Sequence, residues 1–154
     1  LKFRRSSRGE NESDMKILLD TCIVIDFLQG REPFAEDAYQ IFRLLAMEIF
    51  SAYITAKSTT DIYYLTRRCT HSDKEAKDKL NRLLGVLKVA DTLSEDIFNA
   101  LISEAKDFED AVMMETALRI KADGIVTRNT KDYKNSSVKV YTPKEFIKYC
   151  EKSL

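Results

Sequence analysis

The 154-residue sequence contains few residues that break or cross-link a chain: 4 Gly, 2 Pro and 3 Cys. So little Gly and Pro, together with 44% hydrophobic and 32% charged residues, indicates a helix-rich globular protein and argues against disorder. The cysteines, Cys22, Cys69 and Cys150, are odd in number and widely separated, which argues against a disulfide framework. We interpret them as reduced, partly buried thiols of a cytoplasmic protein.

The sequence also lacks an excess of either charge and a long apolar run. It has 25 Lys and Arg against 25 Asp and Glu, so a nucleic-acid partner would have to meet a local patch. No apolar run reaches the roughly 18 residues of a membrane span, and no signal-like segment leads the chain, so we expect no membrane partner. The single histidine, His71, lies in a predicted turn and is expected at the surface.

Residues 1–14 differ from the rest of the chain because they are polar, first basic and then acidic, and show no apolar periodicity. We interpret them as a solvated tail that comes from an appended or upstream-read extension, with Met15 as the native start. The alternative is that the arginines of this tail contact phosphates. A single domain of ordinary length is then expected over residues 15–154.

This domain opens with an apolar run, Lys16-Ile-Leu-Leu, that ends on Asp20. A continuous apolar run is typical of a parallel strand that is covered on both faces. Asp20 would lie at the carboxyl end of this strand, where open α/β sheets bind ligands, so it is a candidate metal ligand or acid/base. The alternative is that Asp20 or Thr21 merely caps the helix that follows.

Strand and helix patterns then alternate along the chain. The predicted strands are 16–19, 52–55, 86–90, 124–127 and 138–141, and the predicted helices are 21–28, 34–50, 57–69, 72–84, 94–105, 108–121 and a last one that begins near 142. This alternation predicts an α/β fold with a largely parallel sheet.

Two further acids lie near the starts of predicted helices. Asp61 borders the buried face of the helix 57–69. In the helix 108–121, Asp110 shares a face with the apolar stripe Met114, Ala117 and Leu118, so its carboxylate is expected to face inward. The alternative is a local role for Asp110, because an acid in the first turn is favoured by the helix dipole and can take part in capping.

A polar run that includes Asn129 and Asp132 follows the predicted strand 124–127. With right-handed crossovers, these residues reach the same edge of the sheet as Asp20, Asp61 and Asp110. A ring of like charges is costly unless cations neutralise it. Oxygen ligands without His or Cys favour Mg²⁺ or Mn²⁺ over Zn²⁺.

The order and spacing of these motifs resemble the PIN-domain family, from Met15 to about Ile147. The matching segments are Leu-Leu-Asp20-Thr21, Gly-Arg-Glu-Pro, an acid before Ile-Tyr-Tyr-Leu, Asp-Phe-Glu-Asp110-Ala and Ile-Val-Thr127-Arg128-Asn129-x-x-Asp132-Tyr. The resemblance implies a three-layer α/β/α fold with a five-stranded, mostly parallel sheet. It also implies a metal-dependent endoribonuclease that uses Mg²⁺ or Mn²⁺ to hydrolyse RNA phosphodiester bonds, often as the toxin of a toxin–antitoxin pair.

The resemblance also assigns roles to individual residues and implies partners. The family's acidic quartet, expected to be catalytic and to bind the metal, matches Asp20, Asp61, Asp110 and Asp132. Thr127 matches the hydroxyl residue that orients the first acid, and Asn129 matches an accessory polar position. Arg128 and Lys131 are expected either to hold the RNA backbone or to be ordinary solvated residues. The implied partners are an RNA substrate, a small antitoxin protein and a second copy in a homodimer, with candidate interface residues Tyr39, Phe42 and Leu45.

Two positions depart from the family's pattern, which usually has Asn at position 22 and Glu at position 61. Cys22 cannot supply the hydrogen bonds of an amide, and Asp61 is one methylene shorter than Glu. These departures keep open the alternative of a non-catalytic PIN-fold binding or regulatory module with a weakened metal site. A phosphoaspartate phosphatase is disfavoured because its pattern needs a second Asp where Cys22 stands. Asp26, on the first helix, is expected at the surface or behind the site.

Overall fold

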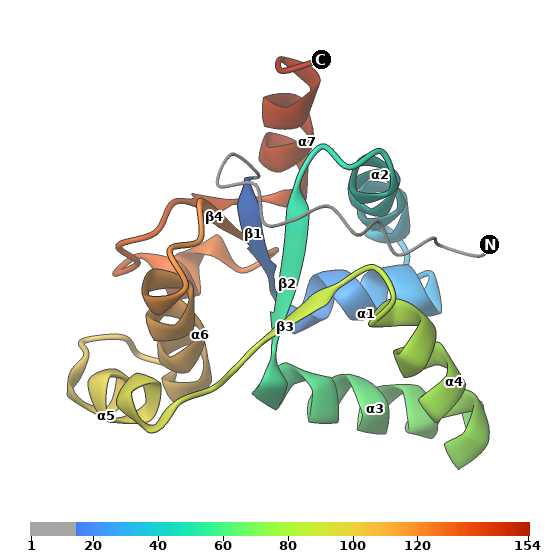
Figure 1. Cartoon of the computed structure of the whole chain (residues 1–154), viewed down its shortest axis with the longest axis horizontal. Coiled ribbons are helices and arrows are strands. Elements are labelled where there is room, and N and C mark those ends of the chain that lie inside the picture. Colours follow the sequence, from blue (N-terminus) through green and yellow to red (C-terminus); the bar gives the residue numbers. More distant parts are fainter. Residues whose placement is uncertain (1–14) are drawn as a thin grey trace.

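The computed structural model describes residues 15–154, and the predicted tail 1–14 lies outside the described residues. Figure 1 shows the elements in chain order. They are β1 (Lys16–Leu19), α1 (Thr21–Gln29), α2 (Ala35–Ala46), β2 (Ser51–Thr55), α3 (Ala56–Thr70), α4 (Asp73–Leu83), β3 (Lys88–Ala90), α5 (Ser94–Ile102), α6 (Phe108–Arg119), β4 (Gly124–Val126), the 3-10 helix η1 (Thr130–Tyr133), β5 (Val140–Tyr141) and α7 (Pro143–Glu151).

The strands form one five-stranded sheet in the order β3-β2-β1-β4-β5, and every pair of neighbours is parallel. Leu18 on the central strand pairs with Tyr53 on β2 and with Ile125 on β4. At Gly124 the neighbouring strand comes so close that a Cβ would lie 2.7 Å from the ring of Tyr141 on β5. The predicted five-stranded parallel sheet is confirmed.

Helices cover both faces of this sheet. Successive residues of β1 point to opposite faces, so they pack into two separate clusters. Ile17 and Leu19 pack into one cluster with side chains from α1, α2, α3 and α7. Leu18 packs into a second cluster with Met113 and Met114 of α6, against which α5 lies (Figure 1). The three-layer arrangement is therefore also confirmed.

The chain builds the sheet outward from β1 to β2 and β3, and only then returns to add β4 and β5 on the other side. The strand order thus reverses between β1 and β4, and sheets of this kind bind ligands beside such a point, at the carboxyl ends of the strands. Asp20 follows β1 directly, and Thr127 follows β4. The topology places these two polar residues next to each other.

Some predicted details were wrong. The helix predicted to reach 50 ends at Ala46, and the strand predicted from 86 begins at Lys88. Leu118 was expected on the buried stripe of α6 but is 49% exposed. Because α6 lies between the sheet and α5, its buried faces are those of Met113 and Ala117 on one side and Val112 on the other, and Leu118 points to solvent. No helix between residues 15 and 154 is long and apolar enough to cross a membrane.

Candidate functional site

Asp20 is held at the carboxyl end of β1 by hydrogen bonds from the neighbouring strand. Its backbone N–H donates to the carbonyl of Val126 at 3.0 Å, and the Thr127 hydroxyl donates to its carboxylate Oδ2 at 2.7 Å. Asp20 is the N-cap residue of α1, but its side chain makes no capping hydrogen bond. The capping alternative is therefore wrong for this carboxylate, which faces the start of the β4–β5 connection instead.

Asp110 lies in the first turn of α6, where Asp107 does the capping. The Asp107 carboxylate accepts the backbone N–H of Asp110 at 2.9 Å. The side chain of Asp110 is therefore free to point away from its own helix, and its Oδ1 accepts a hydrogen bond from the Tyr133 hydroxyl at 3.2 Å. The predicted inward direction of Asp110 agrees with this contact.

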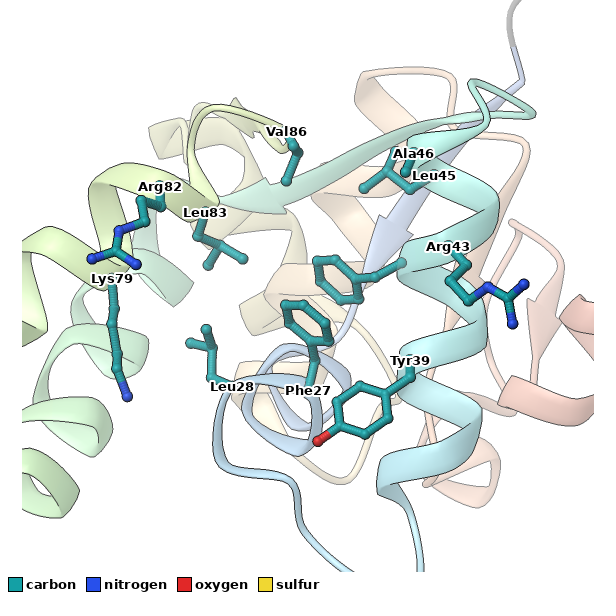
Figure 2. Close-up of a pocket in the computed structure, with 11 residues that line it drawn as sticks. Phe27, Leu28, Tyr39, Arg43, Leu45, Ala46, Lys79, Arg82, Leu83 and Val86 are labelled. Carbon is teal, nitrogen blue, oxygen red and sulfur yellow. The ribbon is translucent and has the colours of Figure 1, made fainter. Parts of the chain in front are cut away.

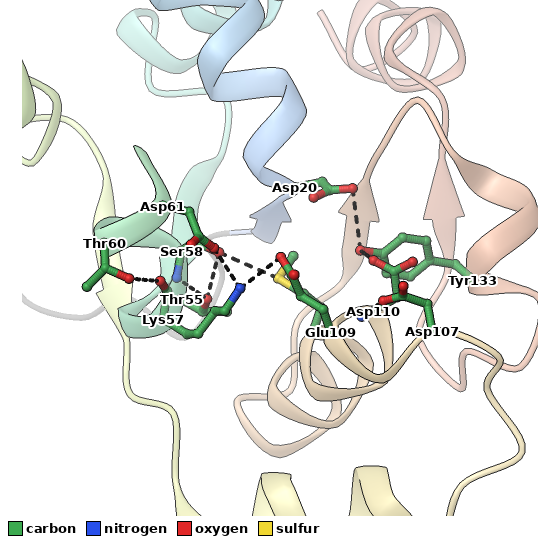
Figure 3. Close-up of polar contacts among 11 residues, drawn as sticks. Asp20, Thr55, Lys57, Ser58, Thr60, Asp61, Asp107, Glu109, Asp110 and Tyr133 are labelled. Carbon is green, nitrogen blue, oxygen red and sulfur yellow. Dashed lines mark hydrogen bonds and ion pairs between the residues drawn. The ribbon is translucent and has the colours of Figure 1, made fainter. Parts of the chain in front are cut away.

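Tyr133 joins the two acids. Its hydroxyl also lies 3.4 Å from Oδ2 of Asp20, so one buried phenol stands between carboxylates from β1 and α6. Figure 3 shows the Tyr133 hydroxyl beside Asp110, with a dashed line that joins it to Asp20. Burial, and then the charges of Asp20 and Asp110, raise the pKa of Tyr133 far above its ordinary value, so the hydroxyl keeps its proton and acts as the donor.

Burial and the negative charges of the site raise the pKa of Asp110. Burial, and then the charges of Asp107, Asp20 and Asp132 in that order of weight, raise the pKa of its carboxyl to about 6. The hydrogen bond from Tyr133 works in the opposite direction but does not offset these effects. Asp110 thus lies where negative charge is crowded and where a cation would relieve the repulsion.

Asp61 is linked to the α6 side of this site by the amine of Lys57. Its carboxylate Oδ2 lies 2.6 Å from the amine of Lys57, one turn earlier on α3, and the same amine lies 2.9 Å from Oε1 of Glu109 on α6 (Figure 3). Glu109 is adjacent in sequence to Asp110. The structure therefore places Asp61 on the α3 side of the site and pairs it with a cation of the chain itself. We call Asp20, Asp61, Glu109, Asp110 and Asp132 the acidic cluster.

The remaining predicted residues lie in the connection after β4. Asp132 is exposed on η1, and its backbone N–H donates to the carbonyl of Asn129 at 3.0 Å. Asn129 is exposed as well, and its backbone N–H donates to the Thr127 hydroxyl at 3.0 Å. Lys131 is exposed on η1. Asp132 acts on the site through its charge on Asp110, because no hydrogen bond joins the two carboxyls among the contacts of the described residues.

Arg128 is occupied by contacts within the protein. Its Nε lies 2.7 Å from Oδ2 of Asp26, which is only 1% exposed, and its guanidinium stacks over the Phe34 ring at 3.8 Å from the ring centroid. Asp26 was expected at the surface or behind the site, and it lies behind it. The buried carboxylate ties the residue after Thr127 to α1.

Cys22, at the position where the family pattern has Asn, is half-buried close to Asp20. Burial, and then the charge of Asp20, raise the pKa of its thiol to about 11. At neutral pH the side chain is therefore a neutral thiol, and it is a poor metal ligand because metals bind the thiolate.

The donor set fits a hard divalent cation in kind. Two carboxylates, Asp20 and Asp110, face one hydroxyl, and oxygen donors of this type suit Mg²⁺ or Mn²⁺. The fit is limited to these two carboxylates. Within residues 15–154, no group of three or more His, Cys, Asp or Glu side chains stands close enough to hold a metal. Asp61 and Glu109 are instead engaged by Lys57.

A family model described as the PIN domain matches residues 16–131. The chain belongs to the PIN-domain family. This PIN domain has no match among curated proteins.

Solved structures with a similar fold include components of toxin–antitoxin complexes. A toxin–antitoxin complex from Klebsiella pneumoniae is 23% identical, with a TM-score of 0.60 over 82% of this chain and 97% of the other. VapBC2 from Rickettsia felis, bound to a promoter DNA fragment, is 18% identical, with a TM-score of 0.60 over 83% and 98%. VapC20 of Mycobacterium tuberculosis, a toxin that cleaves the sarcin-ricin loop, is 15% identical, with a TM-score of 0.55 over 71% and 86%. At these identities the likeness shows the fold.

Sequence reasoning missed three residues of the site: Tyr133, Lys57 and Glu109. Tyr133 directly follows Asp132, and an aromatic residue in an otherwise polar run at a strand tip was an available signal. Lys57 stands four residues before Asp61 on a predicted helix, the spacing at which opposite charges meet. Glu109 adjoins Asp110, but its direction toward α3 depends on the packing of α6.

Proposed function

We propose that this PIN domain is a metal-dependent endoribonuclease that hydrolyses RNA phosphodiester bonds, and that it is the toxin of a toxin–antitoxin pair. The observation that supports this most is the convergence of Asp20 and Asp110 on the Tyr133 hydroxyl at the switch point of the sheet. The family and the activity of the Mycobacterium tuberculosis relative agree with it. Free thiols at all three cysteines fit a cytoplasmic location.

Asp20 and Asp110 would hold the metal, with Asp61 and Asp132 assisting. A bound Mg²⁺ or Mn²⁺ would polarise the phosphate and lower the pKa of a water molecule so that it can attack phosphorus. Thr127 keeps one oxygen of Asp20 fixed by donating to it, which leaves the other oxygen for the metal. Tyr133 retains its proton and holds the two carboxylates side by side.

Substrate contact would come from the exposed part of the β4–β5 connection. Lys131 on η1 is exposed next to Asp132 and can meet a phosphate of the RNA backbone. Arg128, by contrast, would contribute by fixing this connection, since Asp26 and Phe34 already engage its guanidinium. Asn129 would serve as an accessory polar group at the rim.

The test is RNA cleavage as a function of Mg²⁺ or Mn²⁺ for the wild type and for Asp20→Asn. The wild type should cleave RNA only with the metal, and Asp20→Asn should lose about a hundredfold or more of that activity, which is within the range for removing a group that stabilises the transition state. Asp123→Asn is a matched control, because Asp123 accepts the backbone N–H of Lys16 at the opposite end of β1. Equal cleavage by the wild type and Asp20→Asn would contradict the proposal.

A second candidate is a non-catalytic PIN-fold module that binds without cleaving. The absence of a three-ligand group in the described part of the chain, and the pairing of Asp61 with Lys57, favour it. The same titration separates the two functions. Metal binding without cleavage of any RNA would support the binding module.

An antitoxin partner would have a place to bind on the α1–α2–α4 groove, a cavity of about 450 Å³. Its floor is apolar, and three cationic side chains stand at its edge (Figure 2). The lining residues are Phe27, Leu28, Tyr39, Phe42, Arg43, Leu45, Ala46, Lys79, Arg82, Leu83 and Val86. These include Tyr39, Phe42 and Leu45, the interface candidates from the sequence.

The groove favours a helical or extended segment that carries apolar side chains flanked by acidic ones. Arg43, Lys79 and Arg82 provide the complementary charge. The similar structures from Klebsiella pneumoniae and Rickettsia felis are complexes with an antitoxin, which supports a protein segment as the occupant. Arg82→Glu should weaken binding of such a segment by about tenfold in a calorimetric titration, whereas Lys144→Glu on α7 should leave it unchanged. Equal weakening by both would indicate a nonspecific charge effect.

A further inference from the structure

Lys57 places a fixed positive charge between carboxylates of two helices. Its Nζ lies 2.6 Å from Asp61 on α3 and 2.9 Å from Glu109 on α6, as Figure 3 shows. An ammonium group donates hydrogen bonds but accepts none, so toward these two acids it acts as a compact cation. The acids on this side of the cluster already have a counter-ion from the chain.

A buried contact joins the two helices beside this ion pair. Thr55 Oγ1 accepts the backbone N–H of Ser58 at 3.0 Å and so starts α3 at the end of β2. Ser58 Oγ in turn donates to the sulfur of Met113 on α6 at 3.9 Å. The ion pair itself is exposed: the side chain of Lys57 is 43% exposed, that of Asp61 38% and that of Glu109 58%. The ammonium can therefore exchange with cations from solvent without disturbing the buried contact between Ser58 and Met113.

We propose that Lys57 is a positioning residue that competes with the divalent cation for Asp61. The inference rests on the proposed metal-dependent cleavage and deepens it by assigning the regulation of metal uptake to one side chain. While Lys57 bridges Asp61 and Glu109, and Asp107 caps α6, Asp20 and Asp110, with Asp132 at the rim, are the carboxylates of residues 15–154 that remain here for a metal. A metal gains Asp61 as a ligand only when the ammonium moves away.

The competition has a direction that follows from charge. Removing the ammonium frees Asp61 and also removes a repelling charge a few ångströms from an incoming divalent cation, so both effects tighten metal binding. Exposed ion pairs contribute little to folding, so a Lys57 variant is expected to fold. Lys57→Arg keeps the charge and its reach to both carboxylates, and it should behave as the wild type does.

The experiment is a titration of the purified, metal-free protein with Mn²⁺, followed by electron paramagnetic resonance and calorimetry. Lys57→Met should bind Mn²⁺ roughly tenfold or more tightly than the wild type. Lys57→Arg and the control Lys144→Met, on the distant helix α7, should match the wild type. The melting temperature of each variant without metal verifies that it is folded.

Two results would overturn the inference. Unchanged Mn²⁺ affinity in Lys57→Met would show that the ammonium does not compete, and weaker affinity would show that Lys57 assists binding instead. Its failure can be told apart from failure of the proposed function. A wild type that cleaves RNA in an Asp20-dependent way, with Mn²⁺ affinity insensitive to Lys57, would retain the nuclease and reject the competition.

Discussion

At the scale of single residues, Asp110 should make the stability of the protein depend on pH. Its pKa is raised from 3.8 to about 6, so the folded state binds the proton more tightly than the unfolded state. Folding then takes up a proton between these two values, and the stability falls as the pH rises through this window. Above about pH 6 the charged carboxylate is fully unfavourable in the fold.

Asp110→Asn should therefore stabilise the metal-free protein at pH 8 and have little effect near pH 4. A rise of the pKa from 3.8 to about 6 corresponds to about 3 kcal/mol, and discounting for the partly exposed side chain leaves about 1 kcal/mol, or about 2–4 °C in melting temperature. Thermal melts of both proteins from pH 4 to pH 8 with a chelator present measure it. A constant difference at every pH would show that the effect is not one of charge.

At the scale of elements, the Asp26–Arg128 pair should matter more for stability than the exposed ion pairs. Asp26 is 1% exposed, so Asp26→Asn leaves the Arg128 guanidinium, itself only 23% exposed at its side chain, without a counter-ion. The expected loss is about 2–4 kcal/mol of unfolding free energy, measured by urea denaturation. Asp73→Asn, which breaks an exposed pair with Arg67, is the comparison and should cost far less. Equal losses would contradict a special role for the buried pair.

The sequence was sufficient to predict the elements whose pattern is local. The apolar run before Asp20 predicted β1 to the residue, and the alternation predicted the parallel sheet. The pairing of Asp26 with Arg128 was not predictable, because 102 residues separate them and either side chain alone suits a surface. Leu118 was placed wrongly because the helical stripe was assumed to face one neighbour, whereas α6 packs on two.

Part of the candidate site was likewise predictable from the sequence, and part was not. The family resemblance gave Thr127 the role of orienting Asp20, and the Thr127 hydroxyl donates a hydrogen bond to the Asp20 carboxylate. The shared role of Tyr133 and the engagement of Asp61 by Lys57 depend on side-chain directions that no spacing encodes. Whether the four acids act together stays a prediction for the titration of Asp20→Asn.

At the scale of the whole molecule, we expect a homodimer formed through α5. This helix carries three large apolar side chains with high exposure: Phe98 at 66%, Leu101 at 63% and Ile102 at 84%. An exposed apolar group of this kind is typical of a protein–protein contact. Of the second-helix residues suggested from the sequence, Phe42 and Leu45 are only 8% exposed and Tyr39 is 41% exposed, and all three line the α1–α2–α4 groove.

Light scattering at roughly tens of micromolar, suited to a dimer of moderate affinity, measures this expectation. Ile102→Glu should convert the dimer to a monomer, because it places a charge on the apolar face at its most exposed side chain. Met47→Glu is a matched control at another exposed apolar position, 58% exposed after α2, and should remain dimeric. A wild type that is monomeric at this concentration would rule out the dimer.

The burial of Met113 on α6 also allows the opening of the packing around this helix to be measured. Met113 is only 4% exposed and packs among Leu18, Ile125 and Tyr133, so peroxide can reach its sulfur only when this packing opens. The rate at which Met113 becomes the sulfoxide, relative to the exposed Met47, therefore reports how often the packing around Met113 opens. Peptide mass spectrometry can follow both residues in one sample, so Met47 serves as the internal reference for the rate at which the packing around Met113 opens.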